Sequence, residues 1–249
     1  MIIRQDFPAL RRRILDSANL SAPLITICDA TVVETLLNAK PDLLIVDLEH
    51  SVIDTAILQE MVMSAGNTPL LARIRGLERN EIKRVLDTGS AGIIVPGIES
   101  TEDAEKSVQW ARFPPEGTRG VGPGRASAFG YSFAQYSKEK PLVFVQIETP
   151  QALSHVEDIS RVKGLDGLFI GPVDLSTSLG IEFSWSNREF TSAVDRVNSA
   201  ARSHGLITAI YSPLNEASLS EVMKRNFNFI MLGMDREAML QTYSRFIKK

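Results

Sequence analysis

Short apolar segments alternate with helical segments along the chain, and this alternation constrains the fold more than any other feature. Eight apolar segments have the length of strands: residues 24–28, 43–48, 69–74, 92–98, 142–147, 165–170, 206–211 and 229–234. Helical segments follow or separate them, and a further helix is expected over residues 7–17. This pattern in 249 residues is typical of a (β/α)₈ barrel. We therefore predict an α/β fold, a TIM barrel with an additional N-terminal helix.

A doubly wound open sheet is the main alternative to the barrel. It would be expected to carry a Gly-rich phosphate-binding sequence after its first strand, but residues 28–34 read CDATVVE. No linker rich in Pro, Gly or Ser divides the chain. We therefore predict a single barrel domain over residues 1–249.

Composition excludes several classes of function. A net charge of -3 and a pI near 5.7 give no electrostatic reason to expect nucleic acid or an anionic membrane as partner. The single cysteine, Cys28, excludes an intramolecular disulfide and a cysteine zinc cluster. No apolar stretch has the length of a membrane span and no signal peptide is recognised, so we expect a cytoplasmic protein.

Two acidic residues follow neighbouring predicted strands. Glu148 comes directly after residues 142–147, and Asp174 follows residues 165–170 after a Gly-Pro turn. A right-handed βαβ connection makes these strands parallel and places both carboxylates at one edge of the sheet. Two carboxylates facing one cleft suit Mg²⁺ or Mn²⁺. In the alternative interpretation Glu148 is a helix N-terminal acid and Asp174 a turn or cap residue.

His50 shares a short turn with Asp47 and Glu49 after the second predicted strand. A carboxylate partner would orient the imidazole ring and raise its pKa, which suits a catalytic base. The alternative is an ordinary hydrogen-bonded loop histidine.

Arg73 interrupts the apolar segment LLARI, and a buried guanidinium requires an anion. That anion is a substrate carboxylate or enolate, or else Asp47 or Asp87. No lysine falls at the C-terminal end of a predicted strand, so a Schiff-base mechanism is not expected. A divalent metal on the two acids, with Arg73 and His50 beside it, is suited to bind a 2-oxo acid, stabilise its enolate and move protons. These residues point to metal-dependent aldol or retro-aldol chemistry.

Six motifs together resemble one enzyme family. The motifs are VDLEH (46–50), ARI (72–74), LDTG (86–89), FPPEGTRGVGPGRAS (113–127), QIET (146–149) and GPVDLS (171–176). In order and spacing they are similar to the metal-dependent 2-oxo acid aldolases of the HpcH/HpaI aldolase and citrate lyase family.

The resemblance implies a barrel that binds pyruvate through a divalent metal ion, Mg²⁺, Mn²⁺ or Co²⁺, held by Glu148 and Asp174. It implies that Arg73 contacts the oxygen of the pyruvate carbonyl and enolate. His50, supported by Asp47, would handle the proton of the aldol hydroxyl. Further implied site residues are the supporting acid Asp87, and Gln146, Gly171, Pro172 and Val173 together with Asp174 around the pyruvate.

The expected activity is therefore that of a lyase that cleaves or forms 4-hydroxy-2-oxo acids from pyruvate and an aldehyde. One alternative is a lyase acting on an acyl-CoA thioester, and another is a catalytically silent barrel that serves as a binding subunit. The resemblance also implies a homo-oligomer, commonly a hexamer, whose C-terminal helix is exchanged between neighbours.

The motifs do not determine which residues contact the aldehyde acceptor. The sequences ITICDAT and NAKPD depart from the family pattern around the first two strands. Arg119 and Arg125 are candidates for an acceptor anion or for pairing across an interface. The Gly- and Pro-rich loop that carries them is expected to act as a lid or to pack rigidly.

Overall fold

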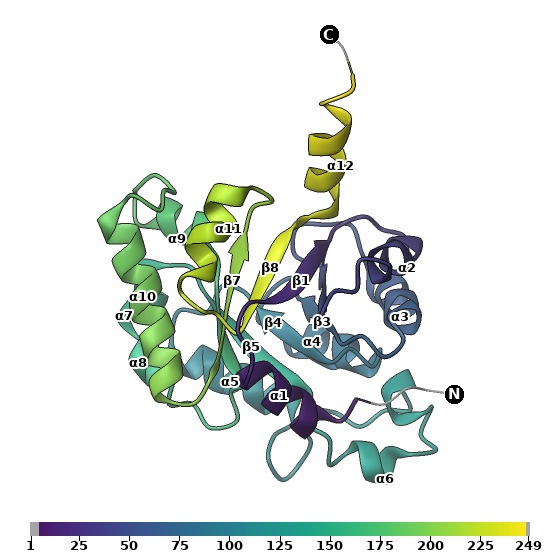
Figure 1. Cartoon of the computed structure of the whole chain (residues 1–249). Coiled ribbons are helices and arrows are strands. Elements are labelled where there is room, and N and C mark those ends of the chain that lie inside the picture. Colours follow the sequence, from purple (N-terminus) through teal and green to yellow (C-terminus); the bar gives the residue numbers. More distant parts are fainter. Residues whose placement is uncertain (1–4, 248–249) are drawn as a thin grey trace.

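The computed structural model describes residues 5–247, and its centre is a closed barrel of eight parallel strands (Figure 1). Each strand pairs with the next in sequence order, and β8 pairs with β1 to close the ring. This confirms the predicted TIM barrel. The strands are β1 (Leu20–Ile25), β2 (Leu44–Asp47), β3 (Leu70–Arg73), β4 (Gly92–Val95), β5 (Leu142–Ile147), β6 (Gly167–Ile170), β7 (Ile207–Ser212) and β8 (Phe229–Met234).

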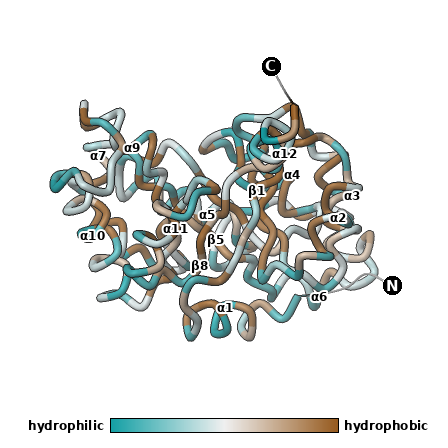
Figure 2. Tube along the Cα trace, turned by 45° about the horizontal axis from the view of Figure 1, so that its top comes forward, coloured by the Kyte–Doolittle hydropathy of each residue, from teal (hydrophilic) through white to brown (hydrophobic). Residues whose placement is uncertain are grey.

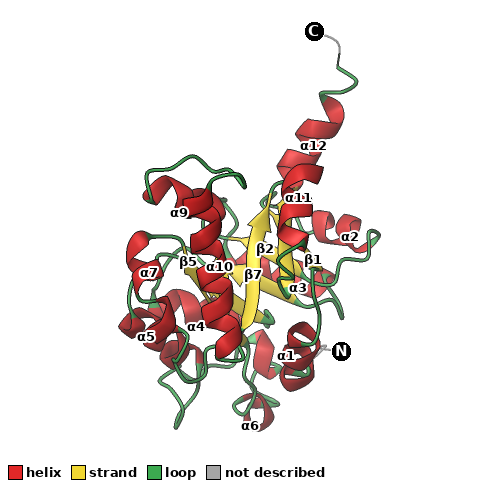
Figure 3. Ribbon diagram, turned by 60° about the vertical axis from the view of Figure 1, so that its left-hand side comes forward, coloured by secondary structure: helices red, strands yellow, loops and turns green. Residues whose placement is uncertain are grey.

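Helices surround the barrel on all sides (Figure 3). They are α1 (Phe7–Leu15), α2 (Thr31–Leu37), α3 (Thr55–Ser64), α4 (Arg79–Asp87), α5 (Thr101–Ala111), α6 (Phe133–Tyr136), α7 (Pro150–Ser154), α8 (Val156–Ile159), α9 (Pro172–Ser178), α10 (Arg188–Ser203), α11 (Glu216–Met223) and α12 (Asp235–Tyr243), with a 3₁₀ turn, η1, at Arg125–Ser127. The additional N-terminal helix, α1, is confirmed. None of the helices within residues 5–247 is both long and apolar enough to span a bilayer.

The first strand differs from its prediction. It begins at Leu20, four residues before the predicted start at position 24, and ends at Ile25. Ser21 and Pro23 interrupt the apolar pattern there, but Leu20 to Pro23 pair in register with Phe229 to Leu232 of β8. Long-range pairing therefore overrides local composition.

The strands alternate between two hydrophobic environments. Inward positions such as Ile45, Leu71, Phe144 and Ala209 form one buried cluster inside the barrel. The alternate positions pack against the surrounding helices in a second cluster. In Figure 2, brown segments of the trace, which are hydrophobic, accordingly run through the centre of the molecule.

Polar side chains occupy the next inward position on several strands, at their C-terminal ends. Asp47, Arg73, Gln146 and Tyr211 each lie two residues beyond one of the inward apolar positions, and Thr26 follows β1 in the same way. We call this set the rim layer. It lines the C-terminal mouth of the barrel, the end where TIM-barrel enzymes carry their active sites.

The two ends of the barrel are finished differently. At the N-terminal end of the strands, Phe7, Leu10 and Ile14 of α1 join the interior cluster. At the C-terminal mouth, Asp235 accepts hydrogen bonds from the backbone N–H groups of Thr26 and Ile27, both at 2.9 Å, and so ties β8 to β1. Beyond Asp235, α12 projects away from the barrel (Figure 1) and contains no buried residue.

Candidate active site

Arg73 and Asp47 form a buried ion pair in the rim layer. Their strands place them side by side, because Asp47 on β2 is in register with Arg73 on β3. Arg73 Nε donates to Asp47 Oδ1 at 3.0 Å, and Nη2 donates to Oδ2 at 2.8 Å. Of the anions predicted for Arg73, Asp47 is therefore the one that this chain itself supplies. The bidentate geometry fixes the guanidinium plane.

Asp47 also organises the turn that follows β2. Its Oδ1 accepts from the backbone N–H of Glu49 at 3.0 Å and of His50 at 3.4 Å. Ser51 Oγ in turn donates to the backbone carbonyl of Asp47. This network holds the Glu49–His50 turn against the ion pair.

Glu49 lies between Arg73 and His50. Its Oε2 is 3.3 Å from Arg73 Nε and 3.7 Å from His50 Nε2, but this buried oxygen accepts no hydrogen bond in the described structure. Burial is the main cause that raises the pKa of Glu49; the charges of Arg73 and His50 oppose it, those of Glu148 and Asp47 add to it, and the resulting pKa is about 7. No separate role was predicted for Glu49 from the sequence, where its place in the turn with His50 is the available signal.

The His50 ring is placed differently from the prediction. Its side chain is 65% exposed at the mouth, and its nearest carboxylate is Glu49. Asp47, the predicted support, contacts only the backbone of His50 because both of its oxygens are engaged by Arg73. The carboxylate that neighbours the His50 ring is therefore Glu49.

Glu148 follows β5 directly, as predicted, and both of its carboxylate oxygens have donors. Oε1 accepts from the backbone N–H of Gly97 at 2.8 Å, and Oε2 accepts from Gln146 Nε2. The other side-chain atom of Gln146, Oε1, is buried without a hydrogen-bond partner in the described structure. An unpaired buried oxygen beside a carboxylate is suited to a ligand or ordered water at this position.

Asp174 lies in the first turn of α9 rather than in an irregular turn. Pro172 occupies the first helical position, where its missing N–H has no cost. The Asp174 side chain is exposed, and no hydrogen bond or ion pair to it is found within residues 5–247. Gly171, the residue before the helix, is buried against Glu148. A Cβ added there would lie 2.9 Å from Gln146 Nε2 and 3.1 Å from Glu148 Oε2.

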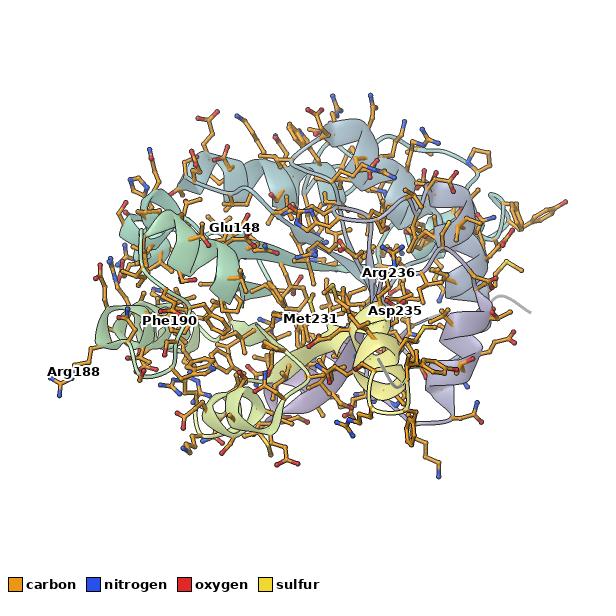
Figure 4. All side chains as sticks on the ribbon, turned by 90° about the horizontal axis from the view of Figure 1, so that it is seen from above. Glu148, Arg188, Phe190, Met231, Asp235 and Arg236 are labelled. Carbon is orange, nitrogen blue, oxygen red and sulfur yellow. The ribbon has the colours of Figure 1, made fainter. Side chains whose placement is uncertain are left out.

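This carboxylate pair fits a hard divalent cation that keeps several waters. Within residues 5–247 no group of three or more His, Cys, Asp or Glu side chains is arranged to hold a metal ion. Mg²⁺ is often bound through one or two carboxylates, with water and substrate completing the octahedron. Glu148, the unpaired Asp174, the unpaired Gln146 oxygen and the space left by Gly171 match that requirement. Figure 4 looks onto this mouth, with Glu148 on one side and Asp235 and Arg236 on the other.

Asp87 is not brought to this site within the chain. It is the last residue of α4, and helices of a barrel run back to the end where the strands begin. There Arg119 Nη2 donates to Asp87 Oδ1 at 2.6 Å and to the hydroxyl of Tyr136 at 3.0 Å. Arg119 is buried and lies over the ring of Phe113, with 4.6 Å between its Cζ and the ring centroid. In this chain Asp87 is therefore a partner of Arg119.

The Gly- and Pro-rich loop lies at the same end of the barrel as Asp87, the end where the strands begin. Gly124 packs against Asp87, and Arg125 Nη1 donates to the carbonyl of Thr88 at 3.1 Å. The expectation of a lid is wrong for the chain's own mouth, because the loop lies at the opposite end of the barrel. At that end Arg119 of the loop is buried, pairs with Asp87 and packs against Phe113.

A cavity of about 890 Å³ also lies at the N-terminal end of the barrel, where Arg11, Arg112 and Asp166 are among its lining residues. Asp166 pairs with Arg11 Nε at 3.0 Å and with Arg112 Nη2 at 3.1 Å. These paired charges stabilise the base of the barrel, far from the carboxylates of the mouth.

Known proteins resemble this chain in both sequence and fold. The sequence model of the HpcH/HpaI aldolase/citrate lyase family matches residues 25–242. A 5-keto-4-deoxy-D-glucarate aldolase of Escherichia coli O139:H28 is 34% identical over 200 residues, 78% of this chain and 77% of that protein.

Two solved structures have the same fold over nearly the whole chain. An HpcH/HpaI aldolase/citrate lyase family protein from Burkholderia cenocepacia J2315 aligns with a TM-score of 0.89 and 28% identity over 96% of this chain and 97% of its own. An HpcH/HpaI aldolase from Desulfitobacterium hafniense DCB-2 aligns with a TM-score of 0.84 and 25% identity over 95% and 94%. The chain is thus a carbon–carbon lyase, and it belongs to the HpcH/HpaI aldolase/citrate lyase family.

Proposed function

We propose that this lyase is a divalent-metal-dependent aldolase that cleaves or forms 4-hydroxy-2-oxo acids, with the enolate of pyruvate as nucleophile and an aldehyde as acceptor. One observation carries the proposal: a guanidinium fixed by Asp47 shares the barrel mouth with the carboxylates of Glu148 and Asp174. Glu148 is close enough to Arg73 for its charge to contribute to the raised pKa of the guanidinium. A fixed positive charge beside two metal-ligand candidates suits the stabilisation of an enolate.

Glu148 and Asp174 are the residues that would hold the metal ion, Mg²⁺, Mn²⁺ or Co²⁺. The bound ion would supply Lewis-acid stabilisation of negative charge on the substrate. Gln146 orients Glu148 through its hydrogen bond and leaves its own oxygen for a site water.

Arg73 binds the oxygen of pyruvate on which negative charge develops. Its Nε and Nη2 are engaged by Asp47, whereas Nη1 has no hydrogen-bond partner within the described residues. This donor is left for the substrate. The carboxylate of pyruvate lies against the backbone from Gly171 to Asp174, where the free N–H groups of Val173 and Asp174 begin α9.

His50 moves the proton of the 4-hydroxyl group, since its ring is exposed at the mouth within reach of Glu49. In the cleavage direction the ring takes this proton as the carbon–carbon bond breaks. In the reverse reaction, the aldol addition, the ring returns the proton to the newly formed alkoxide. Glu49, with its pKa near 7, is the group that holds the ring in position.

An acyl-CoA thioester lyase is the alternative, because the family includes citrate lyases. The aldolase activity is preferred because the curated relative at 34% identity is named an aldolase. We further propose a homo-oligomer in which a neighbouring subunit covers α12, where Leu240 is 71% and Tyr243 61% exposed.

The decisive experiment avoids the unknown aldehyde. Exchange of pyruvate methyl protons with D₂O is followed by NMR with Mg²⁺ or Mn²⁺, and then with EDTA. We expect metal-dependent exchange that Glu148→Ala abolishes. Glu157→Ala, which removes a surface glutamate paired with Arg196, is the matched control and should retain it. Absence of exchange with any metal, in folded protein that binds the metal, would exclude the proposed activity.

A further inference from the structure

Tyr211 and Thr26 are the members of the rim layer that the proposed reaction has not used, and Tyr211 is the more exposed of the two. It lies on β7, two residues beyond the inward Ala209, and packs against the interior cluster. In an eight-stranded ring β7 stands opposite β3, the strand of Arg73. Tyr211 and Arg73 therefore face the mouth from opposite sides.

Glu237 holds the hydroxyl group of Tyr211. The phenol donates to Glu237 Oε2 at 3.4 Å, and Glu237 Oε1 accepts from the backbone N–H of Leu214 at 3.2 Å and from Gln241 Nε2 at 2.9 Å. Burial, together with the charge and hydrogen bond of Glu237, raises the pKa of Tyr211 to about 12, although the positive charge of Arg73 opposes the shift. Tyr211 is thus a neutral phenol whose hydrogen is committed to Glu237. Its oxygen lone pairs are left to accept.

The neighbouring inward positions offer no comparable group. Thr26 donates its hydroxyl to Asp235 Oδ1 at 2.6 Å, and its backbone N–H is bonded to the same carboxylate. Gly233, the inward position of β8, has no side chain, and a Cβ there would lie 2.1 Å from Leu214. Thr26 is 2% exposed, whereas Tyr211 is half-buried, so on the arc of the mouth made by β7, β8 and β1 Tyr211 is the inward hydroxyl-bearing side chain that is open to a ligand.

The donor substrate occupies the other arc under the proposed function. Arg73 is on β3, Glu148 follows β5 and Asp174 follows β6. Pyruvate held by these groups leaves the β7–β8–β1 arc for the aldehyde. A group on the aldehyde that meets Tyr211 there must donate a hydrogen bond, because the phenol hydrogen already points to Glu237.

We propose that Tyr211 is an acceptor-binding residue and that it selects aldehydes carrying a hydroxyl group next to the carbonyl. This inference rests on the proposed function and names the substrate class of its second substrate. A carboxylate at the same position would meet the negative charge of Glu237 and a phenol without a free hydrogen. Hydroxyaldehydes are therefore favoured over aldehydes that lack the hydroxyl.

The test compares glycolaldehyde with acetaldehyde as acceptors for pyruvate. The kcat/KM ratio of the two aldehydes is measured for wild type and for Tyr211→Phe, so that their intrinsic reactivities cancel. We expect Tyr211→Phe to lower the ratio roughly 10-fold through glycolaldehyde alone, the usual effect of one lost hydrogen bond to a substrate. Tyr131→Phe, at a tyrosine that is 98% exposed, should leave the ratio unchanged.

Pyruvate proton exchange separates the possible failures. Exchange should be the same in wild type and Tyr211→Phe, since Tyr211 does not touch pyruvate. An unchanged aldehyde ratio with normal exchange would overturn this inference and leave the proposed function standing. Equal losses for both aldehydes and for exchange would show a structural role instead.

Glyoxylate provides a further comparison, because it carries a carboxylate. If the enzyme prefers glyoxylate and Tyr211→Phe keeps that preference, the β7–β8–β1 arc binds anions and the inference is overturned. Arg236, whose Nη2 donates to the carbonyl of Thr26, would then be the binding residue. Absence of exchange in wild type would overturn the proposed function and this inference together.

Discussion

Asp47 and Arg73 end two neighbouring strands, and their side chains meet in a pair of parallel hydrogen bonds inside the barrel mouth. The strand register alone brings them together, since each is the last residue of its strand. The pair keeps a guanidinium buried, fixed in orientation and charged. The third Arg73 nitrogen, Nη1, is not engaged by Asp47 and is left for a ligand without any movement of the side chain.

Asp47→Asn should cost about 3 kcal/mol of unfolding free energy, because it removes the carboxylate that forms the bidentate pair with the buried Arg73 charge. Urea denaturation of the metal-free protein measures this loss. Asp158→Asn, which breaks the exposed pair between Asp158 and Arg161, should cost no more than about 0.5 kcal/mol. Equal costs for the two variants would show that the Asp47–Arg73 pair adds nothing to stability.

Glu49 should make stability fall as pH rises from about 4.5 to about 7. Its pKa is raised in the folded protein from 4.5 to about 7, so the folded state binds more protons than the unfolded state in this window. The stability present below pH 4.5 is therefore lost as pH approaches 7. Glu49→Gln has no ionisable carboxyl group at this position, so its free energy of unfolding should rise relative to that of wild type as the pH increases across the window.

The measurement is urea unfolding at several pH values in EDTA, with Glu157→Gln as control. Arg196 lowers the pKa of Glu157, so that carboxylate is already ionised in this window and the control difference should stay flat. A flat difference for Glu49→Gln as well would mean that Glu49 titrates normally.

Gly171→Ala should weaken Mn²⁺ binding roughly 10-fold, the size of effect seen when groups behind a metal ligand are disturbed. The added Cβ would lie 3.1 Å from Glu148 Oε2 and would displace the carboxylate. Global stability should change by less than about 1 kcal/mol, because φ at position 171 is -89° and alanine accepts it. Calorimetric titration with Mn²⁺ tests this. Gly122→Ala, where an added Cβ meets nothing within 4 Å, is the control. Wild-type affinity in Gly171→Ala would argue against Glu148 as a metal ligand.

Much of the barrel can be predicted from the local sequence, and the errors in the predicted strand bounds have physical causes. Strands β5 and β8 have the predicted bounds, because burial on both faces leaves a continuous apolar segment. The start of β1 was missed because Ser21 and Pro23 pair with β8, a contact over 200 residues away that no local pattern shows.

The sequence predicts at which edge of the sheet the candidate site residues lie, because strand order decides it, but it does not predict which of their atoms are buried. Glu148 and Asp174 were placed at one edge because both follow parallel strands. Asp87 was grouped with them through the family resemblance, although a residue that ends a barrel helix lies at the other edge. Glu49 was named in its turn, but the position of its buried oxygen depends on how the turn after β2 packs against Arg73 of β3. That three-dimensional arrangement cannot be predicted from the spacing of residues in the motif.

The hydrogen bonds from Thr26 and Ile27 to Asp235 have a consequence for biosynthesis. They join residues more than 200 positions apart, and β1 has its second neighbour only after β8 has been made. A ribosome must therefore extrude almost the entire ring before it can close. Until then the nascent chain presents the unpaired edge of β1, which is open to pairing with other chains. Chaperone demand during synthesis should for this reason depend on the last strand more than on any other.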